Sequence, residues 1–195
     1  MAKKELWTIG HSVHELPEFL EWLKAFKIGL LADVRSFPGS RHVPWAHREL
    51  LPKELAAAGI GYVHLRALGG RRKVLKDSVN TVWRHPAFRS YADYMMNDPA
   101  FGQGLAELKE LAAGQRTCIM CSEALWWRCH RSMIADRLKA DGWRVWHIMG
   151  LGKAEEHPWT GAARLKGGKL LYGPLESAVP FARSPDRPAP PTTDN

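Results

Sequence analysis

Residues 118–132 read Cys-Ile-Met-Cys-Ser-Glu-Ala-Leu-Trp-Trp-Arg-Cys-His-Arg-Ser. The stretch opens with an apolar run typical of a buried strand, and after a short loop it has the pattern of a helix start. Thiol, carboxylate, imidazole and guanidinium groups therefore gather at a predicted strand end. Because ligands of α/β proteins bind outside the carboxyl ends of the strands, this stretch predicts the position of a site as well as the fold class.

Strands and helices alternate on both sides of this stretch. Short apolar segments predict strands at 6–9, 29–34, 62–65, 116–121, 143–148 and 169–172. Helices are predicted near 15–27, 47–58, 87–96, 101–113 and 132–140. Such alternation implies an α/β, Rossmann-like three-layer sandwich with a mostly parallel central sheet flanked by helices.

Length and composition predict one domain. The chain has 195 residues, 45% of them hydrophobic, which is enough for a sizeable core. We assign this domain to residues 1–179. The segment 73–85 lacks a clear period and is predicted to be a surface loop or lid. The Pro-rich segment 180–195 is predicted to be a disordered tail.

The same composition bears on location and redox state. No apolar run reaches the roughly 18 residues of a membrane span, and the first residues contain no signal region, so we expect a cytoplasmic protein without membrane contact. The three cysteines predict reduced thiols rather than a disulfide framework. The oligomeric state does not follow from the sequence.

Positive charge is concentrated in one part of the chain. The net charge is +8, and residues 35–89, with eleven Lys or Arg and three Asp or Glu, account for all of it. Such asymmetry suggests an anionic partner, either a phosphorylated small molecule or a nucleic acid. The alternative is a basic, solvated face without a partner.

Three residues are candidates for catalysis. Cys121, at a strand end near several arginines, is predicted to have a lowered pKa and to act as a nucleophile. Glu123 could serve as a general acid or base, and His11, which follows the first strand, could relay a proton. Alternatively, Cys121 is a small apolar core residue, as we expect for Cys118 within the strand.

A second group is predicted to hold an anion. A helix start offers free N–H groups, and arginine side chains pair with phosphate or carboxylate. The predicted anion-binding residues are Ser12, Arg35, Arg41, His130, Arg131 and Ser132. The alternative for the helix start is that Ser132 caps it while Arg131 pairs with Asp33 or Asp136.

Metal and phosphatase patterns fit less well. Cys121, Cys129 and His130 could bind zinc, but Cys-x7-Cys-His is not a usual finger or ribbon spacing. The Cys-x6-Arg spacing from Cys121 to Arg128 also differs from the Cys-x5-Arg loop of tyrosine phosphatases. We therefore predict no metal and no cofactor.

Motifs spread over residues 6–172 carry a family resemblance. They are Thr8-Ile9-Gly10-His11-Ser12, Asp33 to Arg41, Tyr62 to Leu65 with Leu68-Gly69-Gly70, Phe88 to Ala92, Cys121-x-Glu123 with Cys129 to Ser132, and His157 to Thr160. In these motifs the chain resembles the DUF488 family. The resemblance implies a single α/β domain with the motifs gathered at one site, and it implies no particular reaction.

Three functions are compatible with these patterns. The leading hypothesis is an enzyme that acts on a phosphorylated or nucleotide-like substrate. The second is a non-catalytic nucleic-acid-binding module, in which the 35–89 segment follows phosphates and Trp45, Trp126 or Trp127 stacks on bases. The third is a redox- or metal-responsive protein that uses Cys121 and Cys129.

Overall fold

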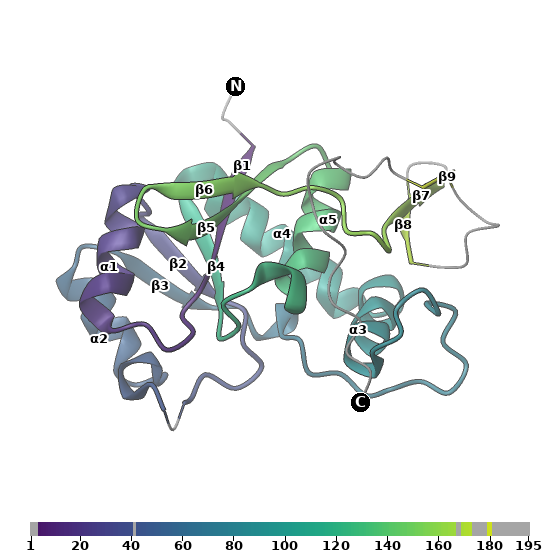
Figure 1. The fold of residues 1–195 in the computed structure, drawn as a ribbon, viewed down its shortest axis with the longest axis horizontal. Coiled ribbons are helices and arrows are strands. Elements are labelled where there is room, and N and C mark those ends of the chain that lie inside the picture. The colour runs from purple at the N-terminus through teal and green to yellow at the C-terminus, as the bar shows by residue number, and fades with distance from the viewer. Residues whose placement is uncertain (1–3, 41, 167–168, 173–178, 181–195) are drawn as a thin grey trace.

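A six-stranded sheet runs through the centre of the molecule (Figure 1). The computed structural model describes residues 4–40, 42–166, 169–172 and 179–180. In spatial order the strands are β3 (Gly61–His64), β2 (Leu30–Asp33), β4 (Thr117–Cys121), β1 (Glu5–Gly10), β5 (Arg144–Gly150) and β6 (Lys153–Glu156). All neighbours pair in parallel except β5 and β6, which are antiparallel. The predicted α/β fold with a mostly parallel sheet is confirmed.

Five α-helices connect and cover these strands. They are α1 (Leu16–Ala25), α2 (Leu51–Ala57), α3 (Pro86–Asn97), α4 (Pro99–Gly114) and α5 (Arg131–Ala140). Short 3₁₀ turns are η1 (Pro44–Ala46), η2 (Arg66–Leu68) and η3 (Trp126–Arg128). Within the described residues, no helix combines the length and the apolar character needed to cross a membrane.

Two hydrophobic cores lie on opposite faces of the sheet, because successive strand residues point to opposite sides. In β1, Leu6 belongs to one core and Trp7 to the other. Helices α1 and α2 cover the Trp7 face, and α4 and α5 cover the Leu6 face with Leu105, Leu108, Ile134 and Leu138. Figure 1 shows the two helix pairs on either side of the sheet, which gives the three predicted layers.

Several elements differ from the predicted ones. Strand β6, with the sequence Lys-Ala-Glu-Glu, was not predicted, because an edge strand can carry charged residues that hide the apolar pattern. A second small sheet, β8 (Lys169–Leu171), β7 (Arg164–Lys166) and β9 (Val179–Pro180), was predicted only at β8. The helix predicted at 47–58 is confined to α2, with Pro52 in its first turn.

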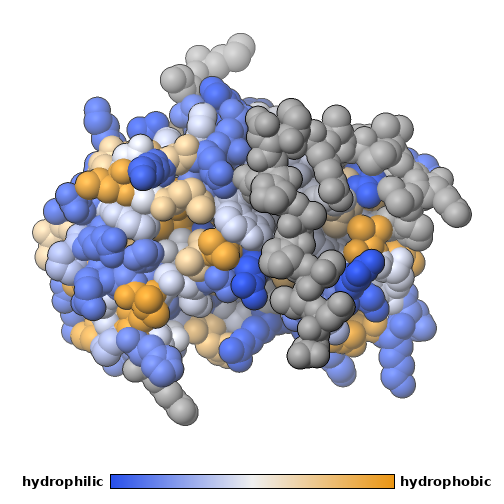
Figure 2. All heavy atoms as spheres, viewed as in Figure 1, coloured by the Kyte–Doolittle hydropathy of each residue, from blue (hydrophilic) through white to orange (hydrophobic). Residues whose placement is uncertain are grey.

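Two further predictions concern surface segments. Residues 73–85, which lead to α3, form turns and loops, and this agrees with the predicted surface loop. The tail predicted at 180–195 lies outside the described residues except for Pro180, which ends β9. In Figure 2, hydrophobic residues on the described part of the visible face form small groups among hydrophilic ones.

The parallel arrangement brings four chain segments together at one edge of the sheet. Gly10 lies opposite Cys121, and Asp33 lies opposite both Met120 and His64. The pairing continues past the strands, since the His11 amide donates to the Cys121 carbonyl at 3.0 Å. A Cβ on Gly10 would lie 2.0 Å from the Glu123 carbonyl oxygen, so only glycine permits this close approach.

Candidate functional site

Two thiols and an imidazole meet at this edge. Cys121 ends β4, whereas Cys129 and His130 precede α5. The two sulfur atoms lie 3.9 Å (Cys121) and 3.6 Å (Cys129) from His130 Nδ1, and all three ligand atoms lie within 4.8 Å of one another. We call Cys121, Cys129 and His130 the thiol–imidazole cluster. Cys121 and Cys129 therefore face each other, which the sequence alone did not show.

The two thiols differ in acidity. The hydrogen bond that Cys121 shares with Cys129, together with burial, raises the Cys121 pKa. Burial opposes ionisation of Cys129, but its hydrogen bond from Cys121 and the charge of Arg131 outweigh burial and lower the Cys129 pKa. The lowered pKa that we predicted for Cys121 belongs to Cys129, because Cys129 receives the hydrogen bond from Cys121 and also one from Arg131 Nε at 3.4 Å.

Arg131 and Ser132 are built into the fold. Both are buried. The Arg131 guanidinium donates to the carbonyls of Glu123 and Ala124, and the Ser132 hydroxyl donates to the Cys129 carbonyl at 2.9 Å. Within the described residues, Arg131 forms no hydrogen bond or ion pair with Asp33 or Asp136, the two alternative partners that we considered. Because Arg131 and Ser132 are buried, their side chains offer an anion little accessible surface.

Arg35 and His11 are likewise committed to protein partners. Arg35 is 4% exposed and donates to both carboxylate oxygens of Asp33, to the Ala46 carbonyl and to His11 Nε2. His11 Nδ1 donates to the Ser12 carbonyl at 2.9 Å, which fixes the tautomer. Burial, and then the Arg35 charge, lower the His11 pKa to about 4, so this imidazole is neutral at pH 7.

The remaining predicted residues are placed as follows. Glu123 is exposed, and its carboxylate accepts from the Leu125 amide rather than joining the thiol–imidazole cluster. Ser12 has a positive φ of 45° in the turn after β1. Arg41 lies outside the described residues. Cys118 is fully buried between the strands and α1, which confirms its predicted core role.

The tryptophans that we considered for base stacking are largely packed. Trp126 is buried and stacks on His147 with centroids 4.2 Å apart. Trp45 packs on Phe19, and its Nε1 donates to the His14 carbonyl. Trp127 keeps more exposure and packs edge-on against Trp126. Trp126 is therefore a core residue and not a stacking surface.

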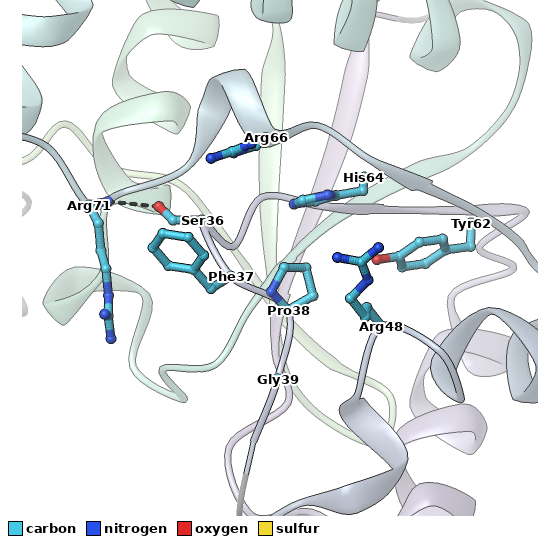
Figure 3. Close-up of a pocket in the computed structure, with 9 residues that line it drawn as sticks. All are labelled: Ser36, Phe37, Pro38, Gly39, Arg48, Tyr62, His64, Arg66 and Arg71. Carbon is cyan, nitrogen blue, oxygen red and sulfur yellow. Dashed lines mark hydrogen bonds between the residues drawn. The ribbon is translucent and has the colours of Figure 1, made fainter.

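A pocket rich in guanidinium groups opens beside β3. Its volume is about 710 Å³, and it is lined by Ser36, Phe37, Pro38, Gly39, Arg48, Tyr62, His64, Arg66 and Arg71. Three arginines and a histidine surround the turn at 36–39, and no carboxylate is among the lining residues (Figure 3). We call this the arginine pocket. Its charge follows from the basic 35–89 segment, and six of its residues lie in the motifs that the family resemblance gathers at one site, but Arg48, Arg66 and Arg71 were not singled out by the sequence.

The walls of the pocket are positioned by β3 and by the turn. Tyr62 donates to Asp33 Oδ2 at 2.9 Å, and His64 Nε2 lies 2.8 Å from the Arg35 carbonyl. The Arg71 amide donates to the Ser36 hydroxyl at 2.9 Å, the bond dashed in Figure 3. Phe37 is 65% exposed, with the Arg71 guanidinium 5.8 Å from its ring centre.

The arginine pocket and the thiol–imidazole cluster both adjoin one short segment, residues 34–36. His130 Nε2 is 3.0 Å from the Val34 carbonyl, while His64 Nε2 bonds to the carbonyl of the next residue, Arg35. Gly70 packs against the His130 ring, and Arg71 lines the pocket. The pocket and the cluster are therefore joined by neighbouring residues at 34–36 and at 70–71.

Comparison with known proteins confirms the family resemblance. A family model described as "Domain of unknown function DUF488" matches residues 15–138. A search of curated proteins found no match, and a search of solved structures found none either. Since the match spans well over half of the chain, including the arginine pocket and the thiol–imidazole cluster, the chain belongs to the DUF488 family.

Proposed function

We propose that this protein is an enzyme that binds a phosphorylated, nucleotide-like small molecule in the arginine pocket. The observation that carries the proposal is that Arg48, Arg66 and Arg71 all line one pocket, which has no carboxylate among its lining residues. A volume of about 710 Å³ falls within the range of small-molecule sites, roughly 300–1,000 Å³. Guanidinium groups bind phosphate through paired, charge-assisted hydrogen bonds.

The pocket also offers surfaces for the uncharged part of such a ligand. The exposed ring of Phe37 and the partly buried ring of Tyr62 provide flat apolar contacts, and His64 adds a polar group. Aromatic stacking of a base contributes about 1–3 kcal/mol. Phosphate recognition by the arginines together with stacking on Phe37 favours a nucleotide over inorganic phosphate.

We expect Arg66→Gln and Arg48→Gln each to weaken nucleotide binding by about tenfold or more. A hydrogen bond to a charged group contributes about 1.5–3 kcal/mol, and glutamine removes the charge while retaining a polar side chain. Isothermal titration calorimetry with nucleoside mono-, di- and triphosphates measures the change.

The matched control is Arg144→Gln, because Arg144 begins β5, which lies beside the edge strand β6 on the side of the sheet away from β3, and is more than half exposed. This variant should bind like the wild type. Equal affinity of Arg66→Gln, Arg48→Gln and wild type for every nucleotide tested would refute the proposed pocket.

Turnover is tested separately by following the mass of the ligand during incubation with the enzyme. Replacing Cys129 with serine should lower any turnover by at least about 100-fold, because the lowered pKa of this thiol leaves it ionised at pH 7 and therefore nucleophilic. Binding should be retained, because Cys129 does not line the pocket. If no ligand that binds is chemically changed, the enzyme proposal fails even though the binding proposal stands.

Single-stranded nucleic acid is the second candidate ligand, favoured by the exposed basic loop that leads away from Arg71. Lys73 and Lys76 are both exposed on it. In this case Lys73→Gln/Lys76→Gln should reduce the salt dependence of oligonucleotide binding by about 1.4, since each phosphate contact contributes about 0.7 to the log–log slope. Affinity for mononucleotides should stay unchanged. An unchanged salt slope would argue against a nucleic-acid ligand.

A further inference from the structure

The thiol–imidazole cluster has the donor atoms and the spacing of a zinc site. Zinc bonds of about 2.3 Å to sulfur and 2.0–2.1 Å to nitrogen, at tetrahedral angles, place sulfur and nitrogen about 3.6 Å apart. The two sulfur-to-Nδ1 distances are 3.6 Å and 3.9 Å. The unusual spacing of the three residues along the chain is bridged by the turn η3, which returns Cys129 to the end of β4.

The His130 ring presents the correct nitrogen to the two sulfur atoms. Its Nε2 lies 3.0 Å from the Val34 carbonyl, an acceptor, so the ring proton resides on Nε2 and the Nδ1 lone pair is available. Metal-binding histidines commonly donate their second N–H to a backbone carbonyl in this way, because the bond fixes both tautomer and orientation.

The ring is also held in place from other directions. A Cβ on Gly70 would lie 2.6 Å from Nδ1, 2.7 Å from Cγ and 3.1 Å from Cε1 of His130. Distances this similar to three ring atoms place Gly70 over the face of the ring, so its edge remains directed at the sulfur atoms. Tyr91 packs edge-on against the ring at 5.1 Å between centroids.

The charge around the cluster suits a metal thiolate. Arg131 Nε donates to the Cys129 sulfur, as outer-shell groups do toward coordinated thiolates. Two thiolates would neutralise a divalent cation. Soft sulfur ligands with an imidazole select zinc over harder cations such as magnesium and calcium.

We propose that Cys121 Sγ, Cys129 Sγ and His130 Nδ1 bind one Zn²⁺ ion and leave its fourth position to water or another small ligand. Within the described residues, no fourth Cys, His, Asp or Glu joins this group. Three protein ligands with one open position is the arrangement of zinc sites that bind or activate a small molecule. The inference shares the Cys129 thiol with the proposed turnover, but it does not depend on which ligand the arginine pocket binds.

Cobalt titration of the reduced, metal-free full-length chain tests the site. We expect one Co²⁺ per chain, with the visible bands of tetrahedral cobalt and near-ultraviolet sulfur-to-cobalt charge transfer, and displacement by one equivalent of Zn²⁺. Cys121→Ser and Cys129→Ser should each reduce the charge-transfer intensity and weaken binding by more than the 10–100-fold loss typical of outer-shell changes.

Cys118→Ala is the matched control, because it removes the thiol that lies in the core and outside the cluster. Arg66→Gln provides a second control and should bind cobalt normally while losing nucleotide affinity. Absence of the cobalt bands in the wild type, or their persistence in a Cys121→Ser/Cys129→Ser variant, would overturn the proposal.

A measurement on the wild type avoids any dependence on how the variants fold. Stoichiometric Zn²⁺ should slow alkylation of Cys121 and Cys129, mapped by peptide mass spectrometry, and circular dichroism should show the same fold with and without metal. Formation of a Cys121–Cys129 disulfide under mild peroxide in the presence of stoichiometric Zn²⁺ would instead mean that the pair is a redox couple, and the zinc assignment would fail.

Discussion

Replacing Arg35 with methionine should lower the free energy of unfolding by about 3–5 kcal/mol. The change leaves the fully buried Asp33 carboxylate without the guanidinium that donates to both of its oxygens. The shortest of these hydrogen bonds are 2.6 Å to Oδ2 and 2.9 Å to Oδ1. Tyr62 and the Arg35 amide would remain as its hydrogen-bond donors. Two neutral donors do not compensate a buried charge.

Urea denaturation followed by circular dichroism measures this loss, and Arg137→Met is its matched control. Arg137 pairs with Asp141 on the surface of α5 with 43% of its side chain exposed, so this change should cost less than about 1 kcal/mol. A loss for Arg35→Met as small as that of the control would show that the buried pair does not stabilise the fold.

The same variant reports on His11. Burial, and then the charge of Arg35, lower the pKa of this imidazole to about 4. Without Arg35 the imidazolium is less disfavoured, so the His11 pKa should rise, which a proton-detected NMR titration would follow. Loosening of the sheet edge would raise this pKa in the same direction, because burial is the larger cause of its lowering.

The Asp33–Arg35 pair also explains why the sequence could not show that Arg35 is held by protein partners. Residues two apart in an extended segment point to the same side, so Asp33 and Arg35 can pair directly. The sequence shows an arginine after a strand but not the Ala46 carbonyl or His11 that complete its environment. Arg48 and Arg66, by contrast, are exposed and line a pocket that has no carboxylate among its lining residues.

Other parts of the molecule followed from local pattern. Strands β2 and β4 are short and almost wholly buried, and an apolar run between polar turns is sufficient to predict them. Strand β6 is a charged edge strand whose existence depends on pairing with β5, a contact that no local pattern encodes. The meeting of Cys121 with Cys129 depends in the same way on the path of the turn between them.

The buried carboxylate of Asp136 makes the second large effect. It accepts hydrogen bonds from His157 Nε2 at 3.0 Å and from Tyr172 at 3.1 Å, and from both the amide and the hydroxyl of Thr160 at 3.0 and 2.6 Å. His157 in turn bonds to His147 at 2.9 Å. The sequence marks His157 to Thr160 as a motif but does not reveal that Asp136 in α5 anchors it.

Asp136→Ala should therefore destabilise the protein by at least about 3 kcal/mol, because each buried donor left without an acceptor costs about 1–3 kcal/mol. Tyr172→Phe, which removes one donor together with its bond, should cost only about 1 kcal/mol. Asp141→Ala, at the partly exposed end of α5, should stay within about 1 kcal/mol of the wild type. Urea denaturation of the three variants gives the comparison, and an Asp136→Ala loss no larger than that of Asp141→Ala would contradict it.

Because the network joins α5 to the segment after β6, the Asp136→Ala loss should also appear as faster amide exchange at 157–160, a local effect that simple loss of core packing elsewhere would not produce.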